Sequence, residues 1–167
     1  PGLVILPTHR LLQTGRRIEP ESILSALRGS FNVDSYGEDH RQQFLSALGR
    51  MGEERHAFGL LLSRDRRLHL LSVPKSGGVP DVVVAHEKLI QGCFGFRPGD
   101  EKDLAKISYI KDAEDLFRRV HEEPDRAGIL LNPSRPAEIL SFVETGATLP
   151  PKSTYFYPKL LSGLVFH

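Results

Sequence analysis

The chain has 167 residues, of which 40% are hydrophobic and 26% charged, and its 22 basic and 21 acidic side chains leave a net charge of +1. A chain of this length can bury about 70% of its extended surface, which favours one globular domain over residues 1–167 and excludes a disordered or fibrous protein. The near-zero charge gives no electrostatic reason to expect DNA, RNA or an anionic membrane as a partner. No apolar run approaches the roughly 20 residues that span a bilayer.

Cys93 is the only cysteine, so a disulfide framework and a multi-cysteine zinc site are both excluded. A single free thiol fits a reducing compartment, and we expect a cytoplasmic location. The sequence opens with PGLVILPTHR, which has neither an initiator methionine nor the features of a signal peptide. We therefore expect the chain to be the C-terminal part of a longer protein.

The first half of the chain predicts four strands and two helices. Pro7 cannot donate to a strand ladder, so the apolar run Leu3–Arg10 is predicted as an edge strand or as a strand that ends near Pro7. Pro20 and Gly29 bound the first helix. The remaining predicted elements are a strand at Phe31–Tyr36, a helix at Glu38–Met51 that ends at Gly52, and a hairpin of Ala57–Ser63 with Leu68–Val73.

The second half alternates strands and helices. The predicted elements are a helix from about Val84 to Phe94, a strand at Ile107–Ile110, a helix at Asp112–His121 capped by Asp112, a strand at Ala127–Leu131, a helix at Arg135–Val143 capped by Ser134, and a strand at Leu160–Phe166. No repeat is present. The pattern indicates a single α+β domain with a mixed or largely antiparallel sheet and about five helices packed on it.

The tail LPPKSTYFYPKLLSG, residues 149–163, has a composition that no regular helix or strand requires. The overlapping segment GATLPPKS, residues 146–153, resembles the phosphate-loop pattern G-x-x-x-x-G-K-[ST], but Pro151 replaces the second glycine, and two prolines remove backbone N–H donors that such a loop needs. A stiff segment that presents an ammonium, hydroxyls and aromatic rings could still bind an anion. The alternative is a closing strap whose rings pack on the core and whose lysines lie in water. The candidate ligand-binding residues here are Lys152, Ser153, Thr154, Tyr155, Tyr157 and Lys159.

The segment PTHR forms a second compact polar group, at the end of the first predicted strand. His9 could act as an acid, a base or a phosphate donor, and Arg10 could hold an anion through two hydrogen bonds. Thr8, His9 and Arg10 are therefore candidate ligand-binding residues, although an ordinary strand exit explains the same pattern.

Other motifs are incomplete. HEKLI at His86 and HEEPD at His121 both lack the second histidine of the metalloprotease motif, so no metal site is predicted. Apolar neighbours surround Cys93, which indicates packing and not a reactive thiol. No cofactor is indicated by any other motif.

The segments GLVILPTHRLL, ISYIKDAEDLFRRV, GILLNP and LPPKSTYFYPKLLSGLV together resemble the second half of the domain of unknown function 1015 family, over Pro1 to Val165. The resemblance implies an uncharacterised conserved bacterial or archaeal protein. It also implies a first half, absent from this chain, with a D-G-H-H-R-like motif similar to that of nucleotide-binding free-serine kinases of the ParB/sulfiredoxin-like group.

Two functional interpretations remain open. The first is the accessory half of a small-molecule or nucleotide-binding enzyme, in which the PTHR segment and the tail meet in a pocket for an anion or a phosphate and the absent N-terminal half supplies the reacting groups. The second is a non-enzymatic interaction or regulatory module. DNA binding is disfavoured by the net charge.

Overall fold

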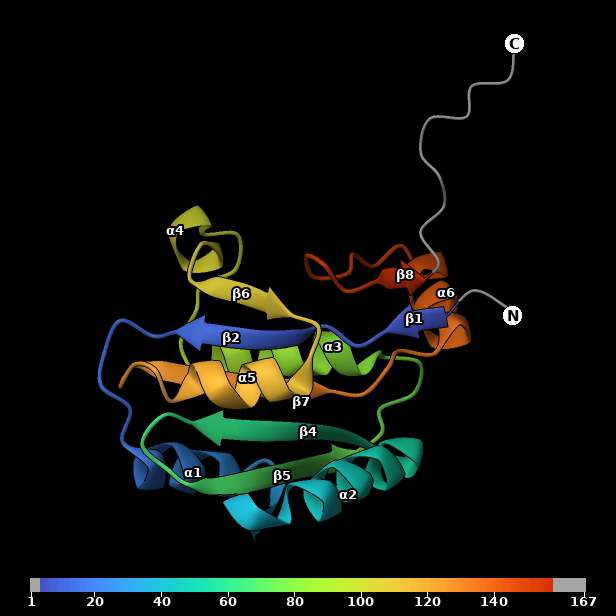
Figure 1. The fold of residues 1–167 in the computed structure, drawn as a ribbon. Helices are drawn as coiled ribbons and strands as arrows, with labels where there is room; N and C mark the ends of the chain where they lie inside the picture. The colour runs from blue at the N-terminus through green and yellow to red at the C-terminus, as the bar shows by residue number, and fades with distance from the viewer. Residues whose placement is uncertain (1–3, 158–167) are drawn as a thin grey trace.

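The computed structural model of the chain describes residues 4–157, with side chains between positions 5 and 155. It contains one six-stranded sheet, in the order β3-β5-β4-β7-β2-β6, and a separate pair of strands, β1 and β8 (Figure 1). Every neighbouring pair is antiparallel. The strands are β1 Val4–Leu6, β2 His9–Gln13, β3 Asn32–Gly37, β4 Arg55–Leu62, β5 Arg67–Pro74, β6 Ile107–Ile110, β7 Arg126–Leu131 and β8 Tyr155–Tyr157.

Helices connect these strands and cover both faces of the large sheet. The α-helices within residues 4–157 are α1 Pro20–Arg28, α2 Arg41–Glu54, α3 Asp81–Val84, α4 Glu101–Leu104, α5 Ala113–Val120 and α6 Pro136–Glu144. A 3-10 turn, η1 Glu38–His40, precedes α2, and a π-helix, η2 Ala85–Cys93, continues α3. No helix in this part of the chain is long and apolar enough to cross a membrane.

The large sheet is the middle layer of three. Side chains alternate along β4, so Phe58, Leu60 and Leu62 belong to one buried cluster, with α1, α3 and η2, and Ala57 and Leu61 belong to the other, with α2 and α5. Figure 1 shows α5 in front of the sheet and α3 behind it. The fold is therefore α+β with an antiparallel sheet, as the sequence predicts.

In the apolar run predicted as the first strand, β1 ends at Leu6, next to Pro7, as one of the two alternatives predicts, but His9 and Arg10 belong to a second strand. The structure divides the run at Pro7 and Thr8 into β1 and β2, and β2 lies between β7 and β6, away from the sheet edge. Proline ends β1 because it has no N–H to donate, and the chain is free to pair on both sides once it has passed Thr8. PTHR is therefore the entrance to an inner strand.

Two helix boundaries also differ from the prediction. Helix α2 continues past Gly52 to Glu54, and a Cβ at Gly52 would stand 2.1 Å from the side-chain nitrogen of Asn132, so this glycine admits a neighbouring side chain. Helix α6 is capped by Arg135 without a side-chain hydrogen bond, and Ser134 is not the cap. The strand predicted at 160–166 lies outside the described residues.

Candidate functional site

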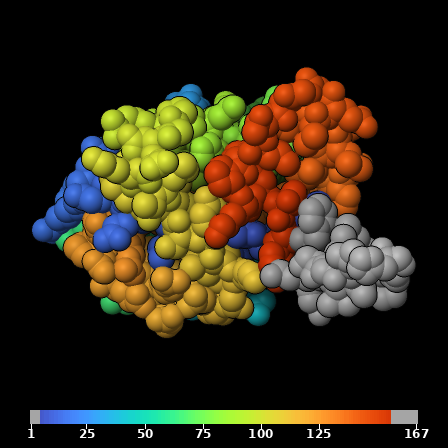
Figure 2. Space-filling view, turned by 90° about the horizontal axis from the view of Figure 1, so that it is seen from above, coloured from blue at the N-terminus to red at the C-terminus, as the bar shows by residue number. Residues whose placement is uncertain are grey.

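The pairing of β1 with β8 brings the tail beside the start of β2. The register places Leu6 opposite Tyr155 and Val4 opposite Tyr157. Because β2 begins three residues after β1 ends, the residues that precede β8 lie next to the entrance of β2. Figure 2 shows this tail segment (red) against the segment that contains β6 (yellow), with atoms of the N-terminal segment (blue) at the seam.

Arg10 is the centre of the polar group at this seam. Its side chain belongs to a residue that is only 4% exposed. The guanidinium donates to the carbonyl oxygen of Thr8 and, at 3.5 Å, to the carbonyl oxygen of Lys152. Strand pairing places Arg10 opposite Tyr109 of β6, and the guanidinium carbon lies 5.2 Å from the centre of that ring. The tail and the sheet therefore meet at one buried cation.

Lys152 adds a second cation to the same ring. Its ammonium lies 5.0 Å from the centre of the Tyr109 ring, and its backbone has a φ of 53°, in the left-handed region. The side chain itself is exposed. A neighbouring contact repeats the arrangement, since the ammonium of Lys111 lies 4.0 Å from the centre of the Tyr155 ring.

Within the described residues, acidic side chains do not balance the charge of this group. Among residues 4–157, no ion pair with a carboxylate involves Arg10, Lys111 or Lys152. Burial lowers the pKa of Arg10 to about 10, so the guanidinium remains protonated at neutral pH. Burial and the Arg10 charge both lower the pKa of His86 on η2, which covers the same face of the sheet. We call Arg10, His86, Tyr109 and Lys152 the Arg10 cluster.

His9 does not join this cluster. Side chains alternate along β2, so His9 and Arg10 point to opposite faces of the sheet. The His9 Nδ1 accepts the backbone N–H of Leu131 at 3.2 Å. Burial, and secondly the charge of Arg10, lower the pKa of His9 to about 4, against a partial opposing effect of Asp112. His9 is a neutral acceptor that ties β2 to β7.

The other candidate residues are distributed around the seam. Thr8 is buried and contributes its carbonyl oxygen, while the Ser153 hydroxyl donates to the carbonyl of Pro150 inside the tail turn. Thr154 is half-buried directly before β8, and Tyr157 belongs to β8 through its backbone. Lys159 lies outside the described residues.

Sequence reasoning missed three residues around Arg10. These are His86 of η2, Tyr109 of β6 and Lys111, which directly follows β6. For Tyr109 and Lys111 the only signal was local, the sequence Ser-Tyr-Ile-Lys at residues 108–111. No set of three or more histidine, cysteine or acidic side chains in the described part of the chain is placed to hold a metal ion.

A family model with the description "Protein of unknown function (DUF1015)" matches residues 1–92, which is more than half of the chain. The chain belongs to the DUF1015 family. The match includes Arg10 and His86 of this DUF1015 chain but ends before Tyr109 and the tail. No curated protein and no solved structure matches the chain.

Proposed function

We propose that this DUF1015 chain binds a small anionic molecule whose phosphate or carboxylate group lies between the cations of Arg10 and Lys152. The observation that supports this function most directly is the burial of Arg10 without an acidic partner among the described residues. A buried charge is costly unless it is paired. An anion would supply the pairing, and Arg with Lys is a common combination for phosphate.

The contact between Arg10 and the tail is weak enough for a ligand to replace it. The hydrogen bond from the guanidinium to the Lys152 carbonyl is 3.5 Å long, at the limit of a hydrogen bond and therefore weak. A charge-assisted bond to a phosphate or carboxylate oxygen is roughly twice as strong as one between neutral groups. We infer that a ligand oxygen replaces the Lys152 carbonyl, while the exposed Lys152 ammonium closes over the anion.

This site would serve a larger enzyme. We infer that the chain is the C-terminal, accessory half of a small-molecule or nucleotide-binding protein and that an N-terminal half supplies the reacting groups. In support, the Arg10 cluster offers cations and rings for binding, whereas the one imidazole within it, His86, lies on η2 beside the Arg10 charge.

Thermal unfolding in the presence of matched ligand pairs tests this function. We expect AMP, phosphoserine and pyrophosphate, which carry phosphate, to raise the unfolding temperature, and adenosine, which carries no anionic group, to leave it unchanged. Serine has a carboxylate but no phosphate and should raise it less than phosphoserine does. A ligand at about 100 times its Kd stabilises by about 2.7 kcal/mol. Equal shifts with AMP and adenosine, or no shift with any of the three anions, would refute an anion site.

Two substitutions locate the binding on the molecule. Lys152→Ala should reduce the shift from the anions, whereas Lys102→Ala on α4, which removes an exposed lysine far along the chain from the tail, should not. If Lys152→Ala is without effect and Tyr155→Ala weakens association with another protein, the interaction module is the better interpretation.

A further inference from the structure

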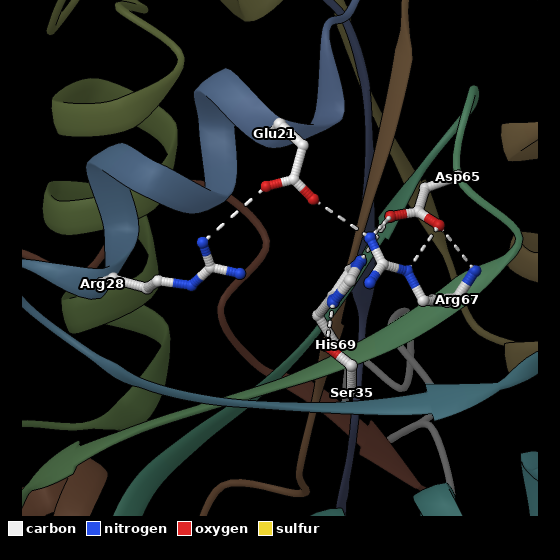
Figure 3. A network of polar contacts seen from close by, with 6 residues as sticks. All are labelled: Glu21, Arg28, Ser35, Asp65, Arg67 and His69. Carbon is white, nitrogen blue, oxygen red and sulfur yellow. Dashed lines mark hydrogen bonds and ion pairs between the residues drawn. The ribbon is translucent and has the colours of Figure 1, made fainter.

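A second polar network lies at the opposite edge of the large sheet, around His69 (Figure 3). His69 on β5 is fully buried, and its strand partner on the edge strand β3 is Ser35. The Ser35 Oγ lies 2.9 Å from His69 Nδ1. On the other side of the ring, Asp65 Oδ2 lies 3.0 Å from His69 Nε2.

The carboxylate decides which ring nitrogen carries the proton. Burial alone would raise the pKa of Asp65, but hydrogen bonds from Arg67 and His69 lower it, so the carboxylate is ionised and accepts. His69 must then donate from Nε2–H, and Nδ1 keeps its lone pair towards Ser35. Burial lowers the pKa of His69, so the ring is unprotonated at neutral pH. The Ser35 hydroxyl therefore donates to a free base.

The exposure of the three groups differs in a way that suits a nucleophile. Ser35 is exposed, whereas His69 is 0% exposed and the Asp65 side chain only 9%. Arg67 holds Asp65 from the backbone N–H at 2.9 Å and from Nε at 3.2 Å, and it also bridges to Glu21 of α1 at 3.2 Å (Figure 3). The base is thus shielded and fixed, while the hydroxyl is reachable from solvent.

We propose that Ser35, with His69 as base and Asp65 as its positioning residue, is an activated nucleophile that accepts an acyl group from an ester. The arrangement has the roles of an aspartate, histidine and serine triad. In the step, a bond forms between Ser35 Oγ and the acyl carbon, and the ester C–O bond breaks. The Ser35 proton passes to His69 Nδ1 and from there to the leaving alcohol, so an acyl-serine results without any redox change. This site is independent of the anion site, which lies at the other edge of the sheet.

The chain contains a matched set of the same three residue types that lacks this property. Asp81 Oδ1 lies 2.7 Å from His56 Nδ1, and Ser76 Oγ lies 3.3 Å from His56 Nε2. However, the backbone N–H of Ser76 also donates to His56 Nε2, at 3.1 Å. The single lone pair of that nitrogen is occupied by the backbone, so His56 fastens a loop and leaves the Ser76 hydroxyl unactivated.

Labelling with an alkyl fluorophosphonate, followed by peptide mass spectrometry, tests the proposal. The probe reacts with an activated serine by forming an Oγ–P bond with loss of HF. We expect the label on Ser35, its absence in Ser35→Ala, and an unchanged rate in Ser76→Ala. His69→Gln removes the base and should slow the labelling at least about 100-fold, since general-base catalysis contributes on the order of 100- to 10,000-fold.

Two further measurements separate activation from a structural role. Asp65→Asn should slow labelling at least about tenfold in a protein that unfolds at a similar temperature, because the carboxylate orients the ring. The wild-type rate should fall with falling pH as His69 gains a proton; the charged groups that act on it are Asp65, Arg67 and Glu21. No label on Ser35, a label on Ser76, or labelling at the wild-type rate in Asp65→Asn and His69→Gln would overturn the proposal.

Discussion

At the scale of single residues, the environment of Arg10 distinguishes a ligand-binding role for its side chain from a structural role. Its guanidinium is buried beside Tyr109 and has two carbonyl oxygens as hydrogen-bond partners among the described residues. A cation kept for stability would be expected to have a carboxylate at this depth, as Arg126 does with Glu122 at 2.7 Å and Glu123 at 2.9 Å. Substituting Arg10 and Arg126 separately therefore tests whether Arg10 stabilises the fold.

Arg10→Met should change the free energy of unfolding by less than about 1 kcal/mol, because the loss of two hydrogen bonds is offset by the removal of a buried charge that has no acidic partner among the described residues. Arg126→Met breaks two ion pairs at a side chain that is 15% exposed and should cost about 1–3 kcal/mol. Urea unfolding measures both values. A loss of 3 kcal/mol or more, on the order expected for a broken buried pair, in Arg10→Met would mean that Arg10 is structural.

The environment of His9 predicts how the free energy of unfolding depends on pH. Its pKa in the folded state is about 4 and its ordinary value is 6.5, so the unfolded chain binds the proton first as the pH falls. The free energy of unfolding should therefore drop between pH 6.5 and 4, by roughly 3 kcal/mol from this group. Above pH 6.5 His9 is unprotonated in both the folded and the unfolded state, so its full contribution to the free energy of unfolding is present.

His9→Gln removes this titration while keeping an acceptor for the Leu131 N–H. Urea unfolding at pH 7.5 and pH 4.5 should show a smaller loss of stability in the variant than in the wild type. His40→Gln, at a side chain that is 51% exposed, is the control. Equal losses in His9→Gln and wild type would contradict the account of His9.

At the scale of the elements, close packing of the helices on the sheet depends on glycine in β4. A Cβ at Gly59 would stand 2.7 Å from the Phe44 ring of α2 and 2.9 Å from Cβ of Leu130 on β7. Gly59→Ala should therefore destabilise the protein by about 1–3 kcal/mol. Gly49→Ala in α2 meets nothing within 4 Å and should stabilise it by about 1 kcal/mol, because alanine favours helix. Thermal unfolding of both variants checks the contrast; a Gly59→Ala variant as stable as the wild type would contradict it.

Most elements could be predicted because their signals are local. Pro20 and Gly29 bound α1, and Asp112 caps α5 by accepting the N–H of Asp115, as expected. The predictions are wrong at positions where a residue distant in the sequence determines the local structure. Gly52 continues a helix because Asn132 packs on it, and η2 is a π-helix for which the sequence carries no distinct signal.

At the scale of the whole molecule, the sequence led us to expect one site shared by its first and last polar segments, and β1 pairs with β8 near Arg10 and Lys152. It could not indicate the aromatic ring between them. Tyr109 reaches the site only because β6 pairs with β2 at the sheet edge, and strand order is set by long-range packing. For the same reason Ser35 and His69 meet across β3 and β5, 34 positions apart.

The same topology keeps the two proposed sites apart. The Arg10 cluster belongs to the edge formed by β2 and β6, and Ser35 with His69 belongs to the edge formed by β3 and β5. We expect that Ser35→Ala leaves anion binding unchanged and that Lys152→Ala leaves serine labelling unchanged. Thermal shift and probe labelling of both variants would detect any coupling between the edges.

We propose above all that the buried guanidinium of Arg10 binds an anion. Titration calorimetry of pyrophosphate into the wild-type protein and into Arg10→Met tests it most directly. We expect saturable binding to the wild type and none to Arg10→Met, with both proteins folded at the temperature used. Undiminished binding to the folded Arg10→Met variant, or no binding to the wild type, would contradict it.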